Sequence, residues 1–399
     1  MNRNITIKTL FLLVLSIGVF TNPAMAQWST IKSMGVGPTD GCYSFTLNGK
    51  GYVGGGSHGS KFYEYDTATN IWTLKGNSPG NKIRGFAFAF AANGKGYVGT
   101  GDTTGSNNSC SDLWMYDPGT GLWTQKSSFP GGARDAEFCF VINNIAYVGG
   151  GDDSAGVWND FYKYDPSIDQ WTPLPALPFN IIFASTFVVN NKGYVATGAG
   201  STEYTALWQY DPVAGSWTPK ASFPGTARQT AFAFALGNFG YVGGGMSSYT
   251  TVFNDMWKYN PVVDSWYAAP AFPSKYPAWT TTFTVGNNAY VGTGTYFTTT
   301  SLIGTDSFKV YRGPVTTGVT EMSTGKGITV YPNPANDRIT ITGDIATGVT
   351  FIINDVTGKE VRTFTDAGKE LYIGDLQPGI YILKCISNTD VFSEKIIKL

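Results

Sequence analysis

A five-residue motif, Tyr-Val followed by small residues and closed by glycine, recurs six times in this chain of 399 residues. Its copies are 45 to 50 residues apart, and two other series keep step with them. One is a tryptophan, and the other is a Tyr-Asp or Tyr-Asn pair that precedes its tryptophan by seven residues in all five copies. The Tyr-Val motifs begin at Tyr52, Tyr97, Tyr147, Tyr194, Tyr241 and Tyr290. The tryptophans are Trp28, Trp72, Trp123, Trp171, Trp217 and Trp266. The Tyr-Asp or Tyr-Asn pairs begin at Tyr65, Tyr116, Tyr164, Tyr210 and Tyr259. A period of this length indicates one supersecondary unit per repeat.

Each repeat is predicted to contain four short antiparallel strands, and the second repeat shows them most clearly. Residues 85–91 alternate large and small side chains, as a strand does. An Asn-Gly turn leads into residues 96–101, which end in glycines. A third strand, 112–116, ends at an Asp-Pro turn, and a fourth carries Trp123. Four strands in each repeat predict a β-propeller blade, and the large apolar area of the tryptophans predicts that they belong to the core.

The two ends of the repeat region complement one another. The last repeat has no tryptophan strand, whereas Trp28 precedes the first repeat. We therefore expect the strand around Trp28 to pair with the segment around Phe308 and to complete the sixth blade. Such closure would leave no sheet edge open to another chain. The predicted fold is all-β, a six-bladed propeller closed by its N-terminal strand.

Composition agrees with this fold and excludes several functions. Glycine contributes 50 residues and charged residues only 14%, which is typical of short strands joined by tight turns. The formal net charge of −1 gives no basic surface for nucleic acid. A single histidine, His58, excludes sites that need two imidazoles. With no nucleophile motif and no metal-ligand spacing, the sequence predicts no catalytic residue, no metal and no cofactor.

The segments outside the repeats have different characters. Residues 1–26 have the pattern of a secretory signal peptide, with a basic start, an apolar stretch and a small-residue cleavage site. Residues 27–312 form the predicted propeller, 313–327 have linker composition, and 328–399 return to the strand alternation of a small Ig-like β-sandwich. No stretch of the mature chain is apolar enough for a transmembrane helix. The four cysteines are predicted to be mainly small buried side chains, with one pair involving Cys110 left open.

The repeats resemble the kelch repeat: an apolar first strand, a glycine-ended second, an aromatic residue before the turn and a tryptophan at fixed distance. The resemblance covers roughly residues 28–312 and implies a kelch-type propeller. In that family the scaffold hosts enzymes, sugar-binding proteins and protein-interaction modules. The fold therefore does not choose the function.

Residues 328–399 resemble the type A sorting domain of type IX secretion in Bacteroidetes-like bacteria. The resemblance implies recognition by the type IX secretion machinery, export through the outer membrane, and a secreted or cell-surface protein. An ordinary Ig-like binding module is the alternative. The residues that carry the resemblance are Tyr331, Pro332, Asn333, Pro334 and Ala335, Asp355, Gly358 and Lys359, Leu376, Gly379 and Tyr381, and the closing residues 395–398.

Variation in length between repeats is confined to the connection between the second and third strands. These connections are expected to open on one face of the propeller, where binding loops occur on a rigid scaffold. Their aromatic residues could contact a sugar or a protein partner, or they could pack against neighbouring loops. The candidates for ligand binding are Trp158, Tyr204, Tyr249 and Tyr296.

Charged candidates occur at recurring positions. Arg84, Arg134 and Arg228 each lie thirteen residues before a Tyr-Val motif, and could either clamp a carboxylate or sulfate at the central channel or tether neighbouring blades. Asp112, Asp160 and Asp255 recur before the third strand, where turn capping is expected. The less periodic residues Asp102, Asp152, Asp153 and Glu137 are candidates for calcium ligands or acid–base carboxylates.

Together these features favour a non-catalytic, secreted or surface-displayed binding propeller for glycan or protein. An alternative is a lyase, epimerase or hydrolase that holds an acidic sugar through the arginines. A second alternative is a structural protein of the cell envelope.

Overall fold

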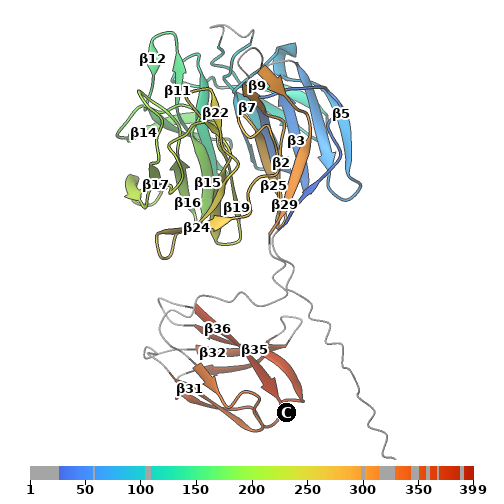
Figure 1. Cartoon of the computed structure of the whole chain (residues 1–399), viewed down its shortest axis with the longest axis vertical. Coiled ribbons are helices and arrows are strands. Elements are labelled where there is room, and N and C mark those ends of the chain that lie inside the picture. Colours follow the sequence, from blue (N-terminus) through green and yellow to red (C-terminus); the bar gives the residue numbers. More distant parts are fainter. Residues whose placement is uncertain are drawn as a thin grey trace, which may run out of the picture. The chain divides into compact units, whose positions relative to one another are not determined.

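The computed structural model describes residues 27–56, 59–103, 109–297, 302–313, 329–342, 350–355, 360–365, 368–386 and 391–399. The chain divides into two compact units, Met1–Pro314 and Val315–Leu399, which are described separately (Figure 1). The predicted signal peptide and linker residues 314–327 lie outside the described residues.

Six sheets of four main strands make up the described part of the first unit (Figure 1). Within each sheet, neighbouring strands are antiparallel. Sheet 1 contains β2 (Cys42–Leu47), β3 (Lys50–Gly55), β4 (Lys61–Asp66) and β5 (Ile71–Asn77); sheet 2 contains β6 (Phe88–Ala92), β7 (Lys95–Gly99), β8 (Leu113–Asp117) and β9 (Leu122–Lys126). Sheet 3 contains β10 (Asp135–Ile142), β11 (Ile145–Asp153), β13 (Phe161–Asp165) and β14 (Gln170–Leu174), with β12 (Gly156–Val157) beside β11; sheet 4 contains β15 (Ser185–Val189), β16 (Lys192–Ala196), β17 (Leu207–Asp211) and β18 (Ser216–Lys220). Sheet 5 contains β19 (Phe232–Leu236), β20 (Phe239–Gly243), β23 (Met256–Asn260) and β24 (Ser265–Ala269); sheet 6 contains β25 (Thr281–Val285), β26 (Asn288–Gly292), β29 (Phe308–Arg312) and β1 (Gln27–Thr30). The remaining elements are the 3₁₀ turn η1 (Pro79–Asn81) and two short hairpins, β21 (Met246–Ser247) with β22 (Thr251–Val252) and β27 (Thr295–Phe297) with β28 (Leu302–Gly304).

The first strands of the six sheets form a closed ring. Each contacts the first strand of the next sheet, and β25 of sheet 6 returns to β2 of sheet 1. Side-chain hydroxyls cross this last seam, since Ser44 donates to the carbonyl of Thr282 at 2.8 Å and Thr46 to that of Thr284 at 2.7 Å. The arrangement is all-β and propeller-like.

The N-terminal strand completes sheet 6. Strand β1 runs antiparallel to β29, and Trp28 lies opposite Tyr311. The predicted pairing of Trp28 with the segment around Phe308 is therefore confirmed. The Trp28 ring also contacts Phe272, with ring centroids 5.0 Å apart, so it joins sheet 6 to sheet 5.

Glycines before the Tyr-Val motifs let neighbouring sheets approach closely. A Cβ atom on Gly51 would lie 2.2 Å from the ring of Phe283 in the preceding sheet, and one on Gly240 would lie 2.2 Å from Phe187. Where the position is not glycine it holds the small residue Ala146 or Ala289. The large side chains of each first strand thus pack their aromatic rings against the backbone of a glycine or alanine in the neighbouring sheet.

The repeated tryptophans pack against the core as predicted, although they are not fully buried. They are half-buried, and five of them follow a fully buried tyrosine by seven residues. Each indole N–H also donates to a backbone carbonyl at the edge of the preceding sheet. The donor–acceptor pairs are Trp28–Pro270, Trp72–Lys32, Trp123–Asn77, Trp171–Ser127, Trp217–Pro175 and Trp266–Ala221.

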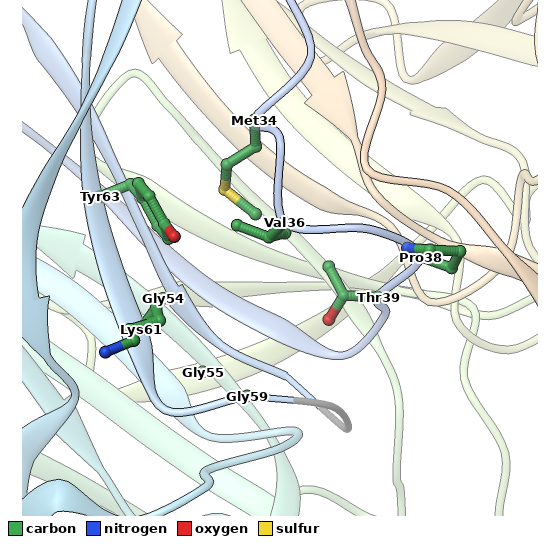
Figure 2. Close-up of a pocket in the computed structure, with 9 residues that line it drawn as sticks. All are labelled: Met34, Val36, Pro38, Thr39, Gly54, Gly55, Gly59, Lys61 and Tyr63. Atoms are coloured by element: carbon green, nitrogen blue, oxygen red, sulfur yellow. The ribbon is translucent and has the colours of Figure 1, made fainter.

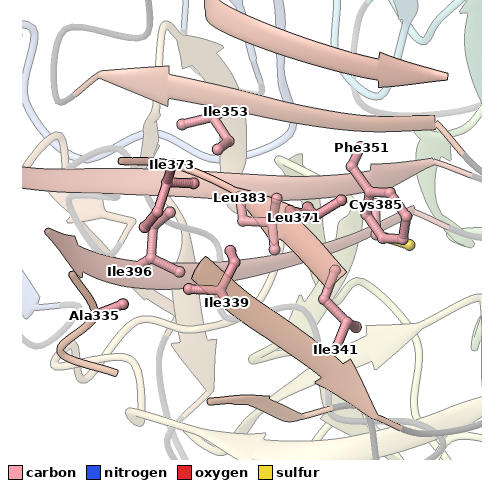
Figure 3. Close-up of a cluster of buried hydrophobic side chains, with 10 residues drawn as sticks. All are labelled: Ala335, Ile339, Ile341, Phe351, Ile353, Leu371, Ile373, Leu383, Cys385 and Ile396. Atoms are coloured by element: carbon pink, nitrogen blue, oxygen red, sulfur yellow. The ribbon is translucent and has the colours of Figure 1, made fainter. Parts of the chain in front are cut away.

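The second unit contains two sheets around one buried core (Figure 3). Both sheets contribute to this core, which contains Ile339, Phe351, Leu383 and Ile396. One sheet has β30 (Thr329–Tyr331), β31 (Arg338–Thr342) and β34 (Glu370–Tyr372); the other has β33 (Glu360–Thr365), β32 (Thr350–Asp355), β35 (Gly379–Ile386) and β36 (Val391–Lys398).

The motif that opens this unit docks on its last strand. The side-chain oxygen of Asn333 accepts a hydrogen bond from the N–H of Ile397 at 2.9 Å, and its amide donates to the carbonyl of Lys395 at 2.6 Å. Tyr381 donates its hydroxyl proton to the carbonyl of Gln377. Gly358 and Lys359 lie outside the described residues.

Candidate functional site

The three arginines considered as an anion clamp are buried structural residues. Arg84, Arg134 and Arg228 are at most 2% exposed. In each, Nη1 donates to a backbone carbonyl of the same sheet, and both terminal nitrogens bond one aspartate. Their charges are thus paired within the chain, and of the two interpretations left open by the sequence these contacts favour a structural tether, formed within one sheet, over an anion clamp. The Nη1–Oδ1 distances are 2.8 Å for Arg84–Asp112, 2.7 Å for Arg134–Asp160 and 2.6 Å for Arg228–Asp255.

The recurring aspartates are therefore ion-pair partners, and the turn-capping prediction for them is wrong. Burial alone would raise the pKa of Asp112 and of Asp255, but hydrogen bonds from the arginine and from a neighbouring indole lower it below its ordinary value. That indole belongs to Trp114 in sheet 2 and to Trp257 in sheet 5. Both partners of each pair sit in strand-flanking loops, so the pairs fix those loops to the sheets.

Most loop aromatics predicted to bind a ligand pack against neighbouring segments outside their own loops, which was the alternative expected from the sequence. Trp158 is 38% exposed and stacks on Arg134, with the guanidinium carbon 5.2 Å from the ring centroid. Tyr204 contacts Phe179 and donates its hydroxyl proton to a carbonyl, and Tyr296 contacts another tyrosine. Tyr249 differs, because it is 48% exposed and its ring lies 6.5 Å from that of Trp279.

A ring of unusual backbone conformations surrounds the point where the six first strands begin. Six equivalent residues, each eleven positions before a Tyr-Val motif, have φ between 50° and 60°. Five of their N–H groups donate to the carbonyl of the preceding member at 2.9–3.1 Å, which includes a bond from Gly41 back to Trp279. We call these residues the central ring: Gly41, Phe86, Ala136, Phe183, Thr230 and Trp279.

Three members of the central ring carry large aromatic side chains. The rings of Phe86 and Phe183 are 5.4 Å apart and those of Phe86 and Trp279 are 5.6 Å apart, so all three converge. None of the three is fully buried. A left-handed conformation costs a non-glycine residue about 1–2 kcal/mol, and bulky residues rarely adopt it. Strain of this kind concentrates at sites where the side chain is needed.

Acidic residues adjoin the central ring along the backbone. Asp135 precedes Ala136 of the central ring and lies opposite Asp152 in the strand ladder. Burial, and then the neighbouring negative charge of Asp152, raise the pKa of Asp135, and burial also raises the pKa of Asp152. Asp102 contributes to the same field and lies opposite Gly85, next to Phe86.

Each central-ring residue is followed by a residue at the start of the first strand, and in sheet 3 this residue is the charged Glu137. The equivalent positions in the other sheets hold Cys42, Ala87, Ala184, Ala231 and Thr280, which are all small and uncharged. One carboxylate oxygen of Glu137 accepts a hydrogen bond from Thr100 at 3.0 Å, while the other, Oε1, is buried with no hydrogen-bond partner. Burial raises the pKa of Glu137 to about 8. A cavity of about 290 Å³ lies along three other first strands, β15, β19 and β25, and its lining includes both small residues such as Ala233 and the aromatic residues Phe187 and Phe283.

A second recess lies beside the chain that enters sheet 1 (Figure 2). Its volume is about 170 Å³, and Met34, Val36 and Pro38 form one wall while Lys61 and Tyr63 face them. The N–H groups of residues 35, 36 and 37 all donate to one carboxylate oxygen of Asp306, which holds this wall in place.

The remaining acidic candidates and the cysteines make no metal site in the described part of the chain. No group of three or more histidine, cysteine or acidic residues there is arranged to hold a metal ion. Asp153 caps a turn by accepting hydrogen bonds from the N–H groups of Ala155 and Gly156. All four cysteines are free thiols.

The aromatic residues of the central ring were not among the candidates predicted from the sequence. Their signal was present, because they lie two residues after the position that holds arginine in three of the repeats. Only aromatic residues in the loops of variable length were considered, whereas Phe86, Phe183 and Trp279 occupy segments of nearly constant length.

Comparison with known proteins supports the two-unit description. Residues 329–399 match the family described as secretion system C-terminal sorting domain. A stretch of 93 residues, 22% of this chain, is 37% identical to N-acetylneuraminate epimerase of Shigella sonnei (strain Ss046) and 36% identical to that of Escherichia coli (strain K12). The match spans 25% of the length of these relatives.

A solved structure, "Structure of YjhT", is similar over 71% of this chain and 99% of its own, with 19% identity and a TM-score of 0.60. At this identity the likeness concerns the fold alone, which is propeller-like. Within the described residues, no helix has the length and apolar character needed to span a membrane. The C-terminal unit is a type IX sorting domain, and the protein is secreted or exposed at the cell surface.

Proposed function

We propose that this protein is an exported binding module, a six-bladed kelch-type propeller that recognises a glycan at the central ring. Six sheets in a closed cycle, with the last completed by β1, support the blade count. The proposed domain limits are those expected from the sequence: a signal peptide over 1–26, a propeller over 27–312, a linker over 313–327 and an Ig-like sorting domain over 328–399.

One observation carries the proposal: three partly exposed aromatic residues occupy left-handed positions at the centre of the ring. Glycine would remove the strain of about 1–2 kcal/mol at each position. Aromatic faces bind the apolar CH faces of sugars, and nearby carboxyl groups accept hydrogen bonds from sugar hydroxyls. Exposed Tyr249 extends the aromatic surface towards the variable loops.

A glycan fits this surface better than a folded protein partner does. The aromatic group is small and central, whereas a stable protein interface needs about 800 Å² on each partner. The loop aromatics that would enlarge the surface, such as Tyr204 and Tyr296, are already engaged with neighbours.

The test is a glycan array probed with the mature full-length protein and with the double variant Phe183→Ala/Trp279→Ala. Binding by the wild type should fall at least ten-fold in the double variant. Tyr267→Ala is the matched control, because Tyr267 is 48% exposed on an outer strand, and it should bind like the wild type. Wild-type binding that survives in the double variant, or binding only to proteins, would contradict the proposal.

A second candidate function is a carbohydrate-active enzyme. The relatives matched over 93 residues are epimerases, and Glu137 is a buried carboxyl group that stays protonated near neutral pH. The arginines proposed to hold an acidic sugar are occupied, so any such enzyme would need another anchor for a carboxylate. Incubation with mono- and disaccharides followed by NMR tests this hypothesis, which requires turnover that Glu137→Gln abolishes.

A further inference from the structure

The charge around the central ring distinguishes between classes of ligand. Two of the acidic residues that adjoin the central ring in sequence or in the strand ladder, Asp135 and Asp152, lie opposite each other, and neither has an ion-pair partner within 4.0 Å among the described residues. Arg134, next to Asp135 in sequence, is bound to Asp160 and is therefore neutralised. Above the raised pKa of Asp135, both carboxyl groups are ionised, and this pair then carries negative charge without an ion-pair partner among the described residues.

Two further features favour a positive group at this place. The faces of Trp, Tyr and Phe rings attract cations through their quadrupoles, and aromatic groups combined with carboxylates bind ammonium ions. The chain already uses this interaction, because Arg228 lies 4.2 Å from the ring centroid of Phe253 and 4.8 Å from that of Phe223. The Oε1 atom of Glu137, which follows Ala136 of the central ring, is buried without a hydrogen-bond partner and adds an unsatisfied polar atom.

We infer that the central ring selects ligands with a positively charged group, such as amine-bearing sugars, and rejects acidic sugars. This inference rests on the proposed glycan-binding function. The ammonium group contacts the rings of Phe86, Phe183 and Trp279 while Asp135 and Asp152 balance its charge. A carboxylate placed there would meet two aspartates, while the three arginines nearest in the repeats are already paired with aspartates. The specificity inferred is therefore opposite to that required for N-acetylneuraminate, the substrate named for the partly matched relatives.

The sharpest test compares two probes of the same shape, choline and 3,3-dimethyl-1-butanol, which differ in one fixed positive charge. Titration calorimetry with the mature full-length protein at pH 8.5 keeps the aspartates ionised. We expect choline to bind at least ten-fold more tightly than its neutral counterpart. The same preference should appear between N,N,N-trimethylglucosamine and N-acetylglucosamine, with N-acetylneuraminate bound most weakly.

Two variants separate the charge effect from loss of folding. Asp135→Asn/Asp152→Asn keeps the shape of both side chains and should reduce the preference for choline to about two-fold or less. Phe86→Leu keeps an apolar side chain but removes the π face, so it should weaken choline binding more than binding of the neutral probe. Circular dichroism and the thermal midpoint show whether each variant is folded.

The outcomes distinguish this inference from the proposed function. Equal affinities for choline and 3,3-dimethyl-1-butanol, or tighter binding of N-acetylneuraminate, would overturn the inference even if neutral glycans bind. A preference for choline without binding of any glycan on the array would uphold the charge selection and overturn the glycan function.

Discussion

Replacing Arg228 with leucine tests whether the buried arginines hold the loops to the sheets. Arg228 is fully buried and makes hydrogen bonds to the carbonyls of Thr226 and Gly244, each at 2.9 Å, and to both carboxylate oxygens of Asp255. Leucine fills part of the space between Phe223 and Phe253 but satisfies none of these acceptors.

The expected loss of unfolding free energy comes from the groups that lose their partner in Arg228→Leu. Removing one partner of a buried pair leaves an uncompensated charge and unbonded carbonyls, which destabilises a protein by about 3–5 kcal/mol. Asp255→Asn should cost less, about 1–2 kcal/mol, because the Asp255 side chain is 40% exposed and water can replace part of the interaction. Since the pairing lowers the pKa of Asp255, its stabilisation is present above the ordinary pKa of aspartate and is lost as the pH falls through the lowered value.

Urea unfolding followed by tryptophan fluorescence gives the difference in unfolding free energy. The matched control is Lys95→Met, which breaks the exposed Lys95–Asp117 pair and should change stability by less than about 1 kcal/mol. If Arg228→Leu also changes stability by less than about 1 kcal/mol, the arginine does not hold the loops to the sheets. Loss of ligand binding at unchanged stability would instead restore the anion-clamp hypothesis.

Four other perturbations probe the fold, the site and the export signal. Trp28→Ala should cost about 3 kcal/mol, because it removes the ring contacts and the hydrogen bond that join sheets 6 and 5, and unfolding measurements would show a smaller loss if β1 is dispensable. Gly51→Val should cost about 1–3 kcal/mol or more, since its side chain would overlap the Phe283 ring; an unchanged thermal midpoint would contradict the close approach. Because the pKa of Glu137 is raised in the folded protein, the stability of the wild type falls as the pH rises from about 4.5 to about 8. Glu137→Gln should therefore be the more stable protein at pH 9. Parallel curves of stability against pH for the two proteins would refute this. Deletion of residues 329–399 should leave the protein in the periplasm of a host with type IX secretion, whereas its appearance in the medium or on the surface would show another export route.

Much of the fold could be predicted because its signals are local and periodic. The Tyr-Val motifs, the Asn-Gly turns and the fixed Tyr-to-Trp spacing each describe one hairpin, and hairpins are specified by neighbouring residues. The pairing of Trp28 with β29 spans nearly the whole repeat region, but it could be predicted by counting strands. The exposure of the tryptophans could not, because it depends on where the indole N–H finds a carbonyl in the adjacent sheet.

The site was less predictable than the fold. The arginine series was recognised by its spacing, and tethering was one of its two interpretations, yet its partners were assigned to turn capping because the pairs join residues 26 to 28 positions apart. The central ring depends on left-handed backbone conformations, and Phe86, Phe183 and Trp279 are residue types that rarely adopt them. The conformational preferences of these residue types therefore gave no indication of the left-handed backbone that distinguishes the central ring.

The composition of sheet 6 has a consequence for folding. Its strands come from both extremes of the repeat region, with Gln27 opposite Arg312. A chain that emerges N-terminus first, as in synthesis, cannot assemble this sheet until nearly everything between those residues has emerged. Until then the ring of sheets is incomplete, because sheet 6 is missing between sheets 5 and 1. The first unit can therefore close only when the chain has been made up to Arg312, shortly before the sorting domain follows in the sequence.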